Sequence, residues 1–474
     1  MVTLIEQQSN MYAVSKGSQL NISVPEVCRV LGMLLKMGIV HMPRYSMYWA
    51  KDFRLNAVAE LLARDRFLAD MRFMHFTDNN AIITNRDDPA YDRFAKIRPL
   101  TDMFKDNCRA MPSGQEQCVD EQVIKFKGRH SCKQYIPNKP TKRGFKVFSR
   151  NSPDGFMHDF KIYDGSKMIV KTSCGYQPGD VVIKLAETLP SNANHIMYYD
   201  NWFTFLELEE ILKERGIYSC ATIRRDRLRN CPTETEAVMR KLGRGSVSCH
   251  TDARSEISIF QWFDSKSVML TSNFAGVNPQ ETVERWDRKK KERVLIPRPN
   301  AVGCYNQSMG GTDLFDMISS LYRLDHKSRK FYRRIFFWVL GSATVNAWVH
   351  YKRQFQCSGL DTKTMLDYLK FITEVSNVLC EGRLERHVMQ VRGRPRLCED
   401  ESEVEQPSAK KRKVVMVSNA IRFDRVDHLP IMVEKSVRRR CRLCHAHSQI
   451  ECEKCDIALC LKNNRNCFRN FHTE

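Results

Sequence analysis

One short apolar run that ends in an acid constrains the fold of this chain more than any other stretch. Residues 195–199 (HIMYY) read as a buried strand, and Asp200 follows them directly. After the acid, Phe205, Leu208 and Leu212 recur at the spacing of one helix face. Because open α/β sheets bind ligands at the carboxyl ends of their strands, this order of strand, acid and helix predicts an α/β core with Asp200 in its site.

A second acidic segment, residues 310–316 (GGTDLFD), stands much later in the chain. Its two glycines permit a tight turn, and Asp313 and Asp316 share one face if a helix follows. Either segment by itself is more simply explained by an Asp that caps a helix. Carboxylates gathered from separate elements are, however, the ligands with which two Mg²⁺ ions clamp a phosphodiester. The sequence therefore predicts a Mg²⁺ site built from Asp200, Asp313 and Asp316.

The charge balance points to a polyanionic partner. The chain has 76 Lys and Arg against 55 Asp and Glu, a net charge of +21, which favours double-stranded DNA over an anionic membrane surface. The longest apolar run, 335–349, is interrupted by polar residues and is shorter than the ~20 residues that a membrane span needs. No secretory signal opens the chain. We expect an intracellular DNA-binding protein with no membrane segment and no small-molecule cofactor.

A cysteine-rich tail predicts bound zinc. Six of the eighteen cysteines crowd between residues 441 and 467, and four of them form two C-x2-C pairs, the spacing of tetrahedral zinc sites. With His472 they overfill a single site, so we expect two structural Zn²⁺ ions. The eighth ligand is His445 or His447, with His445 favoured because it follows Cys444 directly. The expected ligands are Cys441, Cys444, His445, Cys452, Cys455, Cys460, Cys467 and His472.

Helices and strands are expected in separate parts of the chain. Residues 1 to about 110 read as helical, with apolar periodic runs after Pro25 and over 55–74. From Cys118 to Ile169 the pattern changes to strands, and helical periodicity returns after Asp316. The expected core elements are strands at 122–126, 144–148 and 156–163, a helix at 180–189 and the strand that ends at Asp200.

Residues 382–435 are polar and aperiodic and read as a flexible linker. Arg392, Arg394 and Arg396, in RGRPR, resemble the centre of an AT-hook, whose arginines enter a narrow A·T minor groove. An Arg- and Pro-containing linker of no function is the alternative. Residues 410–413 (KKRK) predict a nuclear import signal and hence a nuclear protein, and a solvated charge run is the alternative there.

Three segments together resemble the piggyBac transposase family. They are 119–140, which contains VDEQ, FKGR and QYIPNKP, then YDNWFT at 199–204, and GGTDLFD at 310–316. The resemblance extends from residue 9 to the cysteine-rich tail. Family members carry a longer acidic leading segment, so we expect that this sequence is truncated or has lost that segment.

The resemblance implies an α/β ribonuclease-H-like core with a β-rich insertion, flanked by an all-α DNA-binding domain, plus a small C-terminal cross-brace zinc domain. It also implies a homodimer. The expected ranges are 118–224 and 301–316 for the core, 225–300 for the insertion, 1–117 and 317–381 for the helical dimerisation and DNA-binding domain, 382–435 for the linker and 436–474 for the zinc domain.

A basic segment with interleaved aromatic residues, 322–334, is expected to lie on the DNA-binding domain. Lys and Arg side chains there would contact DNA phosphates, and the alternative is a solvated helix face. The expected contacts are Arg323, Lys327, Arg329, Lys330, Arg333 and Arg334.

The resemblance also implies three catalytic acids, the first at the end of the opening core strand. Matching forwards from Gly144 places this position at Ser152, and matching backwards from Asp164 places it at Asn151. Neither is a carboxylate, and a neutral ligand in place of a charged one should cost several kcal/mol in a site that binds Mg²⁺. Asp154 is the remaining acid that could serve there, by a shift of the backbone.

The leading hypothesis from the sequence is therefore a domesticated, transposase-derived nuclear protein that binds DNA and has lost strand cleavage. The alternative is an active cut-and-paste transposase that uses Asp154 as a displaced first acid. A third hypothesis treats the zinc tail as a chromatin- or protein-recognition module, with the core as its scaffold.

Overall fold

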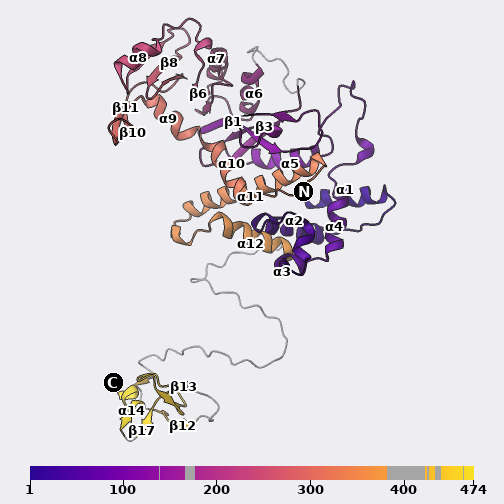
Figure 1. Cartoon of the computed structure of the whole chain (residues 1–474), viewed down its shortest axis with the longest axis vertical. Coiled ribbons are helices and arrows are strands. Elements are labelled where there is room, and N and C mark those ends of the chain that lie inside the picture. The colour runs from indigo at the N-terminus through magenta and orange to yellow at the C-terminus, as the bar shows by residue number, and fades with distance from the viewer. Residues whose placement is uncertain are drawn as a thin grey trace. The chain divides into compact units, whose positions relative to one another are not determined.

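The computed structural model describes residues 1–137, 139–165, 177–381, 422–423, 426–432, 439–462 and 464–473. They belong to two compact units, Met1–His387 and Val388–Glu474, whose courses Figure 1 shows. Arg392, Arg394 and Arg396 of the AT-hook-like motif, the import signal at 410–413 and most of the predicted linker lie outside the described residues.

The first unit begins with helices, as predicted. Pro25 stands in the first turn of α2, and the apolar face of this helix is buried from Val27 onward. The periodic run 55–74 is not one helix, because it is divided into two between residues 60 and 63. The helices are α1 (Val2–Val14), α2 (Val24–Ile39), α3 (Asn56–Ala59), α4 (Arg64–Phe73) and α5 (Arg98–Arg109), with short 3₁₀ turns at Tyr45–Trp49 and Asn79–Ala81.

A mixed sheet forms the centre of the unit. Its strands lie in the order β2-β3-β1-β5-β6-β9-β8-β7, with β4 paired to β3. β1 is antiparallel to β3 and parallel to β5, and β5 is parallel to β6. The strands and their helices are β1 (Glu116–Lys125), β2 (Gln134–Tyr135), β3 (Arg143–Asn151), β4 (Met157–Ile162), α6 (Gln177–Ala186), β5 (Ile196–Tyr199), α7 (Leu206–Glu214) and β6 (Tyr218–Thr222).

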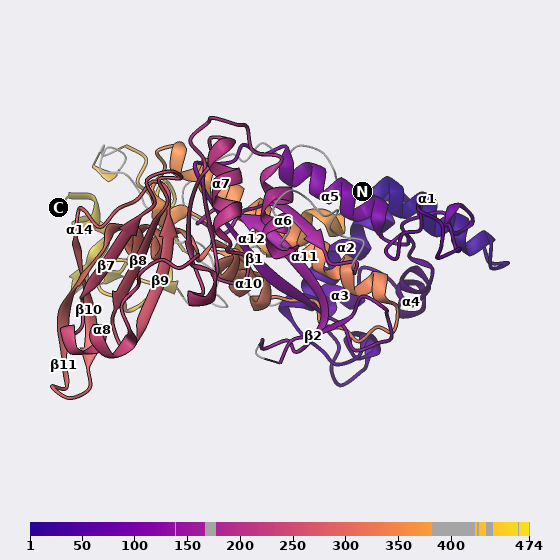
Figure 2. The ribbon, with the colours of Figure 1, turned by 90° about the horizontal axis from the view of Figure 1, so that it is seen from above.

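The segment expected as an insertion extends this sheet. β9 pairs with β6, so the hairpin strands β7–β9 continue the core sheet away from α1–α4, as Figure 2 shows. β10 and β11 form a separate two-stranded ribbon. The elements are a 3₁₀ turn at Arg225–Arg227, α8 (Glu236–Leu242), β7 (Val247–Thr251), β8 (Ser258–Phe263), β9 (Ser267–Ser272), β10 (Glu281–Asp287) and β11 (Glu292–Arg298).

Helices from the end of the unit pack on those from its beginning. At Gly32 of α2 an added Cβ would lie 2.6 Å from the Ser376 carbonyl oxygen, so glycine permits the close approach to α12. Lys36 donates a hydrogen bond to Asn377 at 2.5 Å across the same interface. The late helices are α9 (Asn300–Ser308), α10 (Gly311–Leu321), α11 (Phe331–Cys357) and α12 (Tyr368–Glu381), with a 3₁₀ turn at Thr362–Thr364.

Successive side chains of β1 point to opposite faces of the sheet. Val119 belongs to an apolar cluster that α6 and α7 build on one face of the sheet. Ile124, of opposite parity, belongs to the cluster that includes α10 and α11 on the other face. Since side chains alternate along a strand, Asp120 points to the face that α10 and α11 cover.

The second unit is small and built of short strands. β12 pairs with β15, although β12 precedes the expected start of this domain at residue 436. No helix in the described part of the chain combines the length and apolarity needed to cross a membrane. The elements are β12 (Pro430–Met432), β13 (Arg439–Arg440), β14 (His447–Ser448), β15 (Ile450–Cys452), β16 (Ile457–Ala458), β17 (Leu461–Lys462), β18 (Arg465–Asn466) and α14 (Cys467–Thr473).

Candidate active site and metal centres

Two acids stand side by side where parallel strands β1 and β5 meet. Val119 pairs with Tyr199 in the register of the two strands, so Asp120 and Asp200 are the next residues of each. Neighbouring strands lie about 4.8 Å apart, so Asp120, inside β1, lies beside the end of β5, where Asp200 follows. Asp200 also accepts a hydrogen bond from the Trp202 N–H at 2.9 Å, so it closes a tight turn and does not cap α7.

The first turn of α10 brings two further acids to β1. An added Cβ at Gly311 would lie 2.3 Å from the Ser152 carbonyl oxygen and 2.9 Å from Cys118 Sγ, so only glycine allows this close packing. Gly310 is the residue before the helix, which leaves the exposed Asp313 free of a capping role. Asp316 follows on the same face of the helix.

Burial and mutual repulsion raise the pKa of these carboxyl groups. Burial raises the pKa of Asp120 to about 7, and the charges of Glu121 and Asp200 add to the effect. Burial likewise raises the pKa of Asp316 to about 7, with Asp313 contributing repulsion. The pKa of Asp200 is also raised, by burial and by Glu121. Asp120 and Asp200 are therefore one pair of neighbouring acids and Asp313 and Asp316 another, and Lys139 interacts with members of both pairs.

Lys139 is a positively charged side chain that interacts with these acids. Burial opposes its ionisation, but the carboxylates of Asp120, Glu121 and Asp313 outweigh burial and raise the pKa of Lys139. Its ammonium group lies 3.5 Å from Glu121 Oε1. The amine of Lys146, 3.8 Å from the centre of the Trp202 ring, is the second nearby cation.

The residues proposed from sequence as the first acid lie elsewhere. Asn151 is fully buried beneath α10 and accepts a hydrogen bond from Thr312 at 3.2 Å, and Ser152 is buried beside it. Burial opposes ionisation of Asp154, but Arg353, at 2.6 Å, outweighs it and lowers the pKa of this carboxyl. Arg353 thus neutralises Asp154.

The sequence predicts the first acid at 151–154, whereas the structure has another acid, Asp120, beside Asp200. β1 begins at Glu116 and not at Gln122, so Asp120 lies inside the first core strand, whereas Asn151 ends β3 and residues 152–154 follow it. The signal that could have found it is the segment VDEQ at 119–122, which belongs to the matched motifs. Its Asp120 follows an apolar residue, as Asp200 does.

The donor set fits a hard divalent cation. Carboxylate oxygens are the ligands that Mg²⁺ prefers. With pKa values of about 7, Asp120 and Asp316 are partly protonated at neutral pH, so a bound cation would displace protons. The acids do not form a closed ligand shell: in the described part of the chain, Cys and His groups of the second unit alone bring three or more such ligand atoms within 4.8 Å of one another.

The basic segment expected to contact DNA is a loop between α10 and α11 that runs into the first turn of α11. Lys327 and Arg329 are exposed, and Arg323 is 44% exposed. Lys330 donates to the Arg72 carbonyl oxygen at 3.1 Å, and burial, together with neighbouring cations, lowers its pKa to about 8.

The two arginines that follow are less accessible. Arg333 is half-buried, with two of its guanidinium nitrogens lacking a hydrogen-bond partner. Arg334 is 7% exposed and is paired with Asp325 at 3.0 Å. Its guanidinium also donates to the carbonyl oxygens of Lys125 and His326. This side chain joins α11 to β1, a position that does not favour the predicted contact of Arg334 with DNA.

Four cysteines form the first candidate metal centre. Ligand atoms of Cys441, Cys444, Cys460 and Cys467 lie within 4.8 Å of one another. The Sγ atoms of Cys444 and Cys460 are 3.5 Å apart, against roughly 3.8 Å expected for two thiolates on a tetrahedral zinc. Burial and the neighbouring thiols raise the pKa of Cys460 to about 11, so a cation is required for all four to ionise together.

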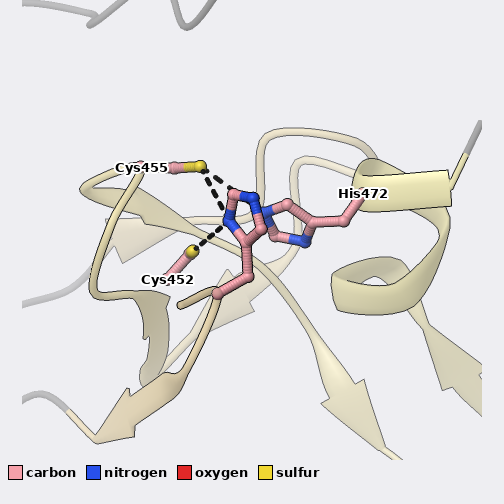
Figure 3. A group of neighbouring side chains, drawn as sticks. Cys452, Cys455 and His472 are labelled. Carbon is pink, nitrogen blue, oxygen red and sulfur yellow. Dashed lines mark hydrogen bonds between the residues drawn. The ribbon is translucent and has the colours of Figure 1, made fainter. Parts of the chain in front are cut away.

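Two cysteines and two histidines form the second centre. It consists of His428, Cys452, Cys455 and His472, and Figure 3 shows Cys452, Cys455 and His472 converging, the histidine from α14. His428 Nδ1 lies 3.4 Å from both sulfur atoms, and His472 Nε2 lies 3.5 Å from Cys455 Sγ. His472 Nδ1 donates to the Phe468 carbonyl oxygen at 2.7 Å, which leaves Nε2 as the ligand nitrogen.

His428 replaces the expected His445. Pairing of β12 with β15 places Pro430 opposite Cys452 and so brings His428 to this centre. His445 is exposed, has a φ of 57° and donates its N–H to the Cys441 carbonyl oxygen at 2.9 Å. His445 therefore closes the turn of the first C-x2-C pair. Asp456, with a φ of 50°, closes the turn of the second pair in the same way. The seven other predicted ligands all belong to the two centres.

The ligands of the two centres alternate along the chain. The pair 441/444 shares a centre with 460/467, while the pair 452/455 lies between them in sequence and shares the other centre with 428 and 472. This is the cross-braced arrangement that the family resemblance implies.

Comparisons with known proteins agree with this architecture. A family model described as Transposase IS4 matches residues 1–348. Human PiggyBac transposable element-derived protein 3 is 29% identical over 100% of this chain and 74% of its own length. Human PiggyBac transposable element-derived protein 2 is 28% identical over 99% of this chain and 74% of its own length.

Among solved structures, piggyBac transposase in a synaptic complex with hairpin DNA is similar in fold. The two chains are 19% identical, with a TM-score of 0.67 over 97% of this chain and 94% of that one. Since the family model covers most of the sequence and the relatives extend over all of it, the chain belongs to the piggyBac-type transposases of the IS4 family.

Proposed function

We propose that this chain is a Mg²⁺-dependent DNA transposase that cleaves and joins phosphodiester bonds. The observation that carries the proposal is the position of Asp120 beside Asp200. Near them α10, which carries Asp313 and Asp316, packs through Gly311 against Cys118 of β1. The hypothesis of a non-cleaving domesticated protein depended on a missing first acid. Asp120 is an acid beside Asp200, which weighs against that hypothesis. Asp154 is paired with Arg353, which weighs against its use as a metal ligand.

In this proposal Asp120, Asp200 and Asp313 hold the metal ions, and Asp316 assists from the next turn of α10. When bound, Mg²⁺ supplies the Lewis acidity that activates a hydroxyl nucleophile and stabilises the leaving oxygen. The chain's own part is to orient the carboxylates. The turn at Asp200 and the tight packing at Gly311 do this, because both fix the backbone next to an acid.

Lys139 also has a role in the proposed mechanism. Its ammonium offsets the charge of the acid cluster while no metal is present, since it interacts with Asp120, Glu121 and Asp313. A divalent cation held by the acids would compensate the same negative charge, which would leave Lys139 available to contact a DNA phosphate.

Double-stranded DNA is the proposed substrate. The net charge of +21, the exposed Lys327 and Arg329, and the DNA in the related synaptic complex support it. The proposal includes action as a homodimer in the nucleus. Two structural Zn²⁺ ions in the second unit are also proposed, because the donor sets and ligand separations suit zinc.

The experiment is a cleavage assay on plasmid DNA that carries the terminal repeats flanking the gene. We expect nicking and joining that require Mg²⁺ and are lost in Asp200→Asn. Ca²⁺ in place of Mg²⁺ serves as a control for binding without chemistry. DNA binding without any Mg²⁺-dependent cleavage by the unmodified chain would contradict the proposal and favour the non-cleaving alternative.

A further inference from the structure

The first turn of α10 rests on the turn that joins β3 to β4. An added Cβ at Gly311 of α10 would lie 2.3 Å from the carbonyl oxygen of Ser152. An added Cβ at Gly155, where φ is 91°, would lie 3.3 Å from Cγ of Leu314. Positions 311 and 314 share one face of the helix, so this face is in contact with the turn at 152–155. The turn therefore supports the helix that carries two of the acids.

A buried hydrogen bond between side chains joins the same helix to the end of β3. Thr312 Oγ1 donates to Asn151 Oδ1 at 3.2 Å. Cys118 Sγ, from β1, lies 3.7 Å from the same hydroxyl oxygen, and Cys118 is the cross-strand partner of Asn151. These three residues are at most 1% exposed. The hydroxyl group of Thr312 thus contacts both strands from within the first turn of the helix.

This contact lies next to the acids in the sequence and in the fold. Thr312 directly precedes Asp313, and Cys118 stands two residues before Asp120 on the same face of β1. Close packing at glycine limits how near the helix comes to the sheet but does not select one rotation about the helix axis. A hydrogen bond is directional and does select one. The bond from Thr312 to Asn151 therefore helps to set the rotation of the turn on which Asp313 lies.

Resting on the proposed function, we propose that Thr312 and Asn151 are positioning residues. Their hydrogen bond orients Asp313 toward the divalent cation that the acids of the sheet also hold. Replacing a group that orients a metal ligand changes metal affinity or activity by roughly 10–100-fold. An amide suits this role, because its oxygen accepts the hydrogen bond without placing a charge in a fully buried position. Asn151 thus acts through α10 and not as a metal ligand.

The test measures binding of Mn²⁺, a paramagnetic substitute for Mg²⁺, to the full chain without DNA by electron paramagnetic resonance. Thr312→Val retains the shape of the side chain and removes the donor, so we expect Mn²⁺ affinity to fall roughly tenfold. Thr312→Ser retains the donor and should retain the affinity. The matched control is Thr101→Val, because Thr101 is 2% exposed and donates to the Arg98 carbonyl oxygen at 2.9 Å within α5. This control should lower stability but not Mn²⁺ affinity.

The Mg²⁺ concentration that gives half-maximal DNA cleavage is a second readout, and it should rise by a similar factor in Thr312→Val. Equal Mn²⁺ affinity of Thr312→Val and the unmodified chain would overturn the inference, and so would an equal loss in Thr101→Val. Either result would show that the hydrogen bond serves the fold alone. If Thr312→Val does not fold, Asn151→Ala removes the acceptor and is judged by the same two outcomes. Mn²⁺ binding that Asp200→Asn leaves unchanged would instead contradict the proposed function, and this inference with it.

Discussion

Asp120 and Asp200 are neighbours across the parallel pairing of β1 and β5, one residue beyond the Val119–Tyr199 pair. Burial raises the pKa of both carboxyl groups, and the charge of Glu121 adds to the effect on each. Asp154, the first acid inferred from the sequence, is instead held by Arg353 at 2.6 Å. The two candidates for the first acid therefore differ in what surrounds them, and substitution separates them.

Asparagine at Asp120 and asparagine at Asp154 should have different effects on DNA cleavage. We expect Asp120→Asn to lower the rate of Mg²⁺-dependent DNA cleavage by roughly 10³, the scale of losing a group that stabilises the transition state. Asp154→Asn should reduce stability, because it leaves Arg353 without its partner, but retain most cleavage. Rates of nicking measured at matched folded fractions check this. Loss of activity in Asp154→Asn alone would restore the displaced-acid hypothesis.

Binding of Mg²⁺ should release protons near neutral pH. Asp120 and Asp316 have pKa values of about 7 in the metal-free chain, so each is about half protonated there, and the cation requires them ionised. Calorimetric titration in two buffers of different ionisation enthalpy measures the number released. We expect roughly one proton per chain at pH 7 and fewer at pH 8.5. A buffer-independent enthalpy at pH 7 would contradict the raised pKa values.

The same two carboxyl groups should make the metal-free chain less stable as pH rises. Their pKa rises from 3.8 in the unfolded chain to about 7 in the folded one, so the folded state binds more protons between these values. Their contribution is fully present below pH 4 and is lost as pH rises through 7. In urea unfolding, Asp316→Asn should have a flatter decline in stability than the unmodified chain between pH 5 and 8. Parallel curves would show that Asp316 titrates normally.

Metal content should distinguish His428 from His445. Each full-length chain should contain about two zinc ions, since two sets of four ligands are present. His428→Ala should lower the content to about one and destabilise the second unit. His445→Asn, chosen because asparagine tolerates a φ of 57°, should retain both ions. Zinc loss in the His445 variant and not in the His428 variant would reverse the assignment.

Salt dependence of DNA binding should identify the phosphate contacts. Alanine at Lys327 or at Arg329 should reduce the slope of log K against log salt by roughly one each, because both side chains are exposed. Arg334→Ala should leave the slope unchanged but destabilise the fold by roughly 1–3 kcal/mol, because it removes the hydrogen bonds to the carbonyl oxygens of Lys125 and His326, while Asp325 keeps Lys125 as a partner. An unchanged slope in the Lys327 and Arg329 variants would mean that this loop does not contact DNA.

Much of the local structure followed from the sequence. The strand that ends before Asp200 and the helix after it are β5 and α7, and α2 begins at the predicted proline. These features depend on neighbours within a few residues, through apolar spacing and turn chemistry. The types of ligand in the second unit, and the need for two centres, followed from the number of Cys and His residues.

Contacts between distant segments were decided only by the tertiary structure. The sequence placed Asp120 outside any strand, because β1 continues through polar residues that an apolar pattern does not include. Its role as the neighbour of Asp200 depends on pairing between β1 and β5, which no local pattern specifies. His428 was missed for the same reason, since β12 pairs with β15 from outside the cysteine-rich run. Local spacing therefore determined which kinds of ligand the chain has, whereas strand pairing determined which of them meet.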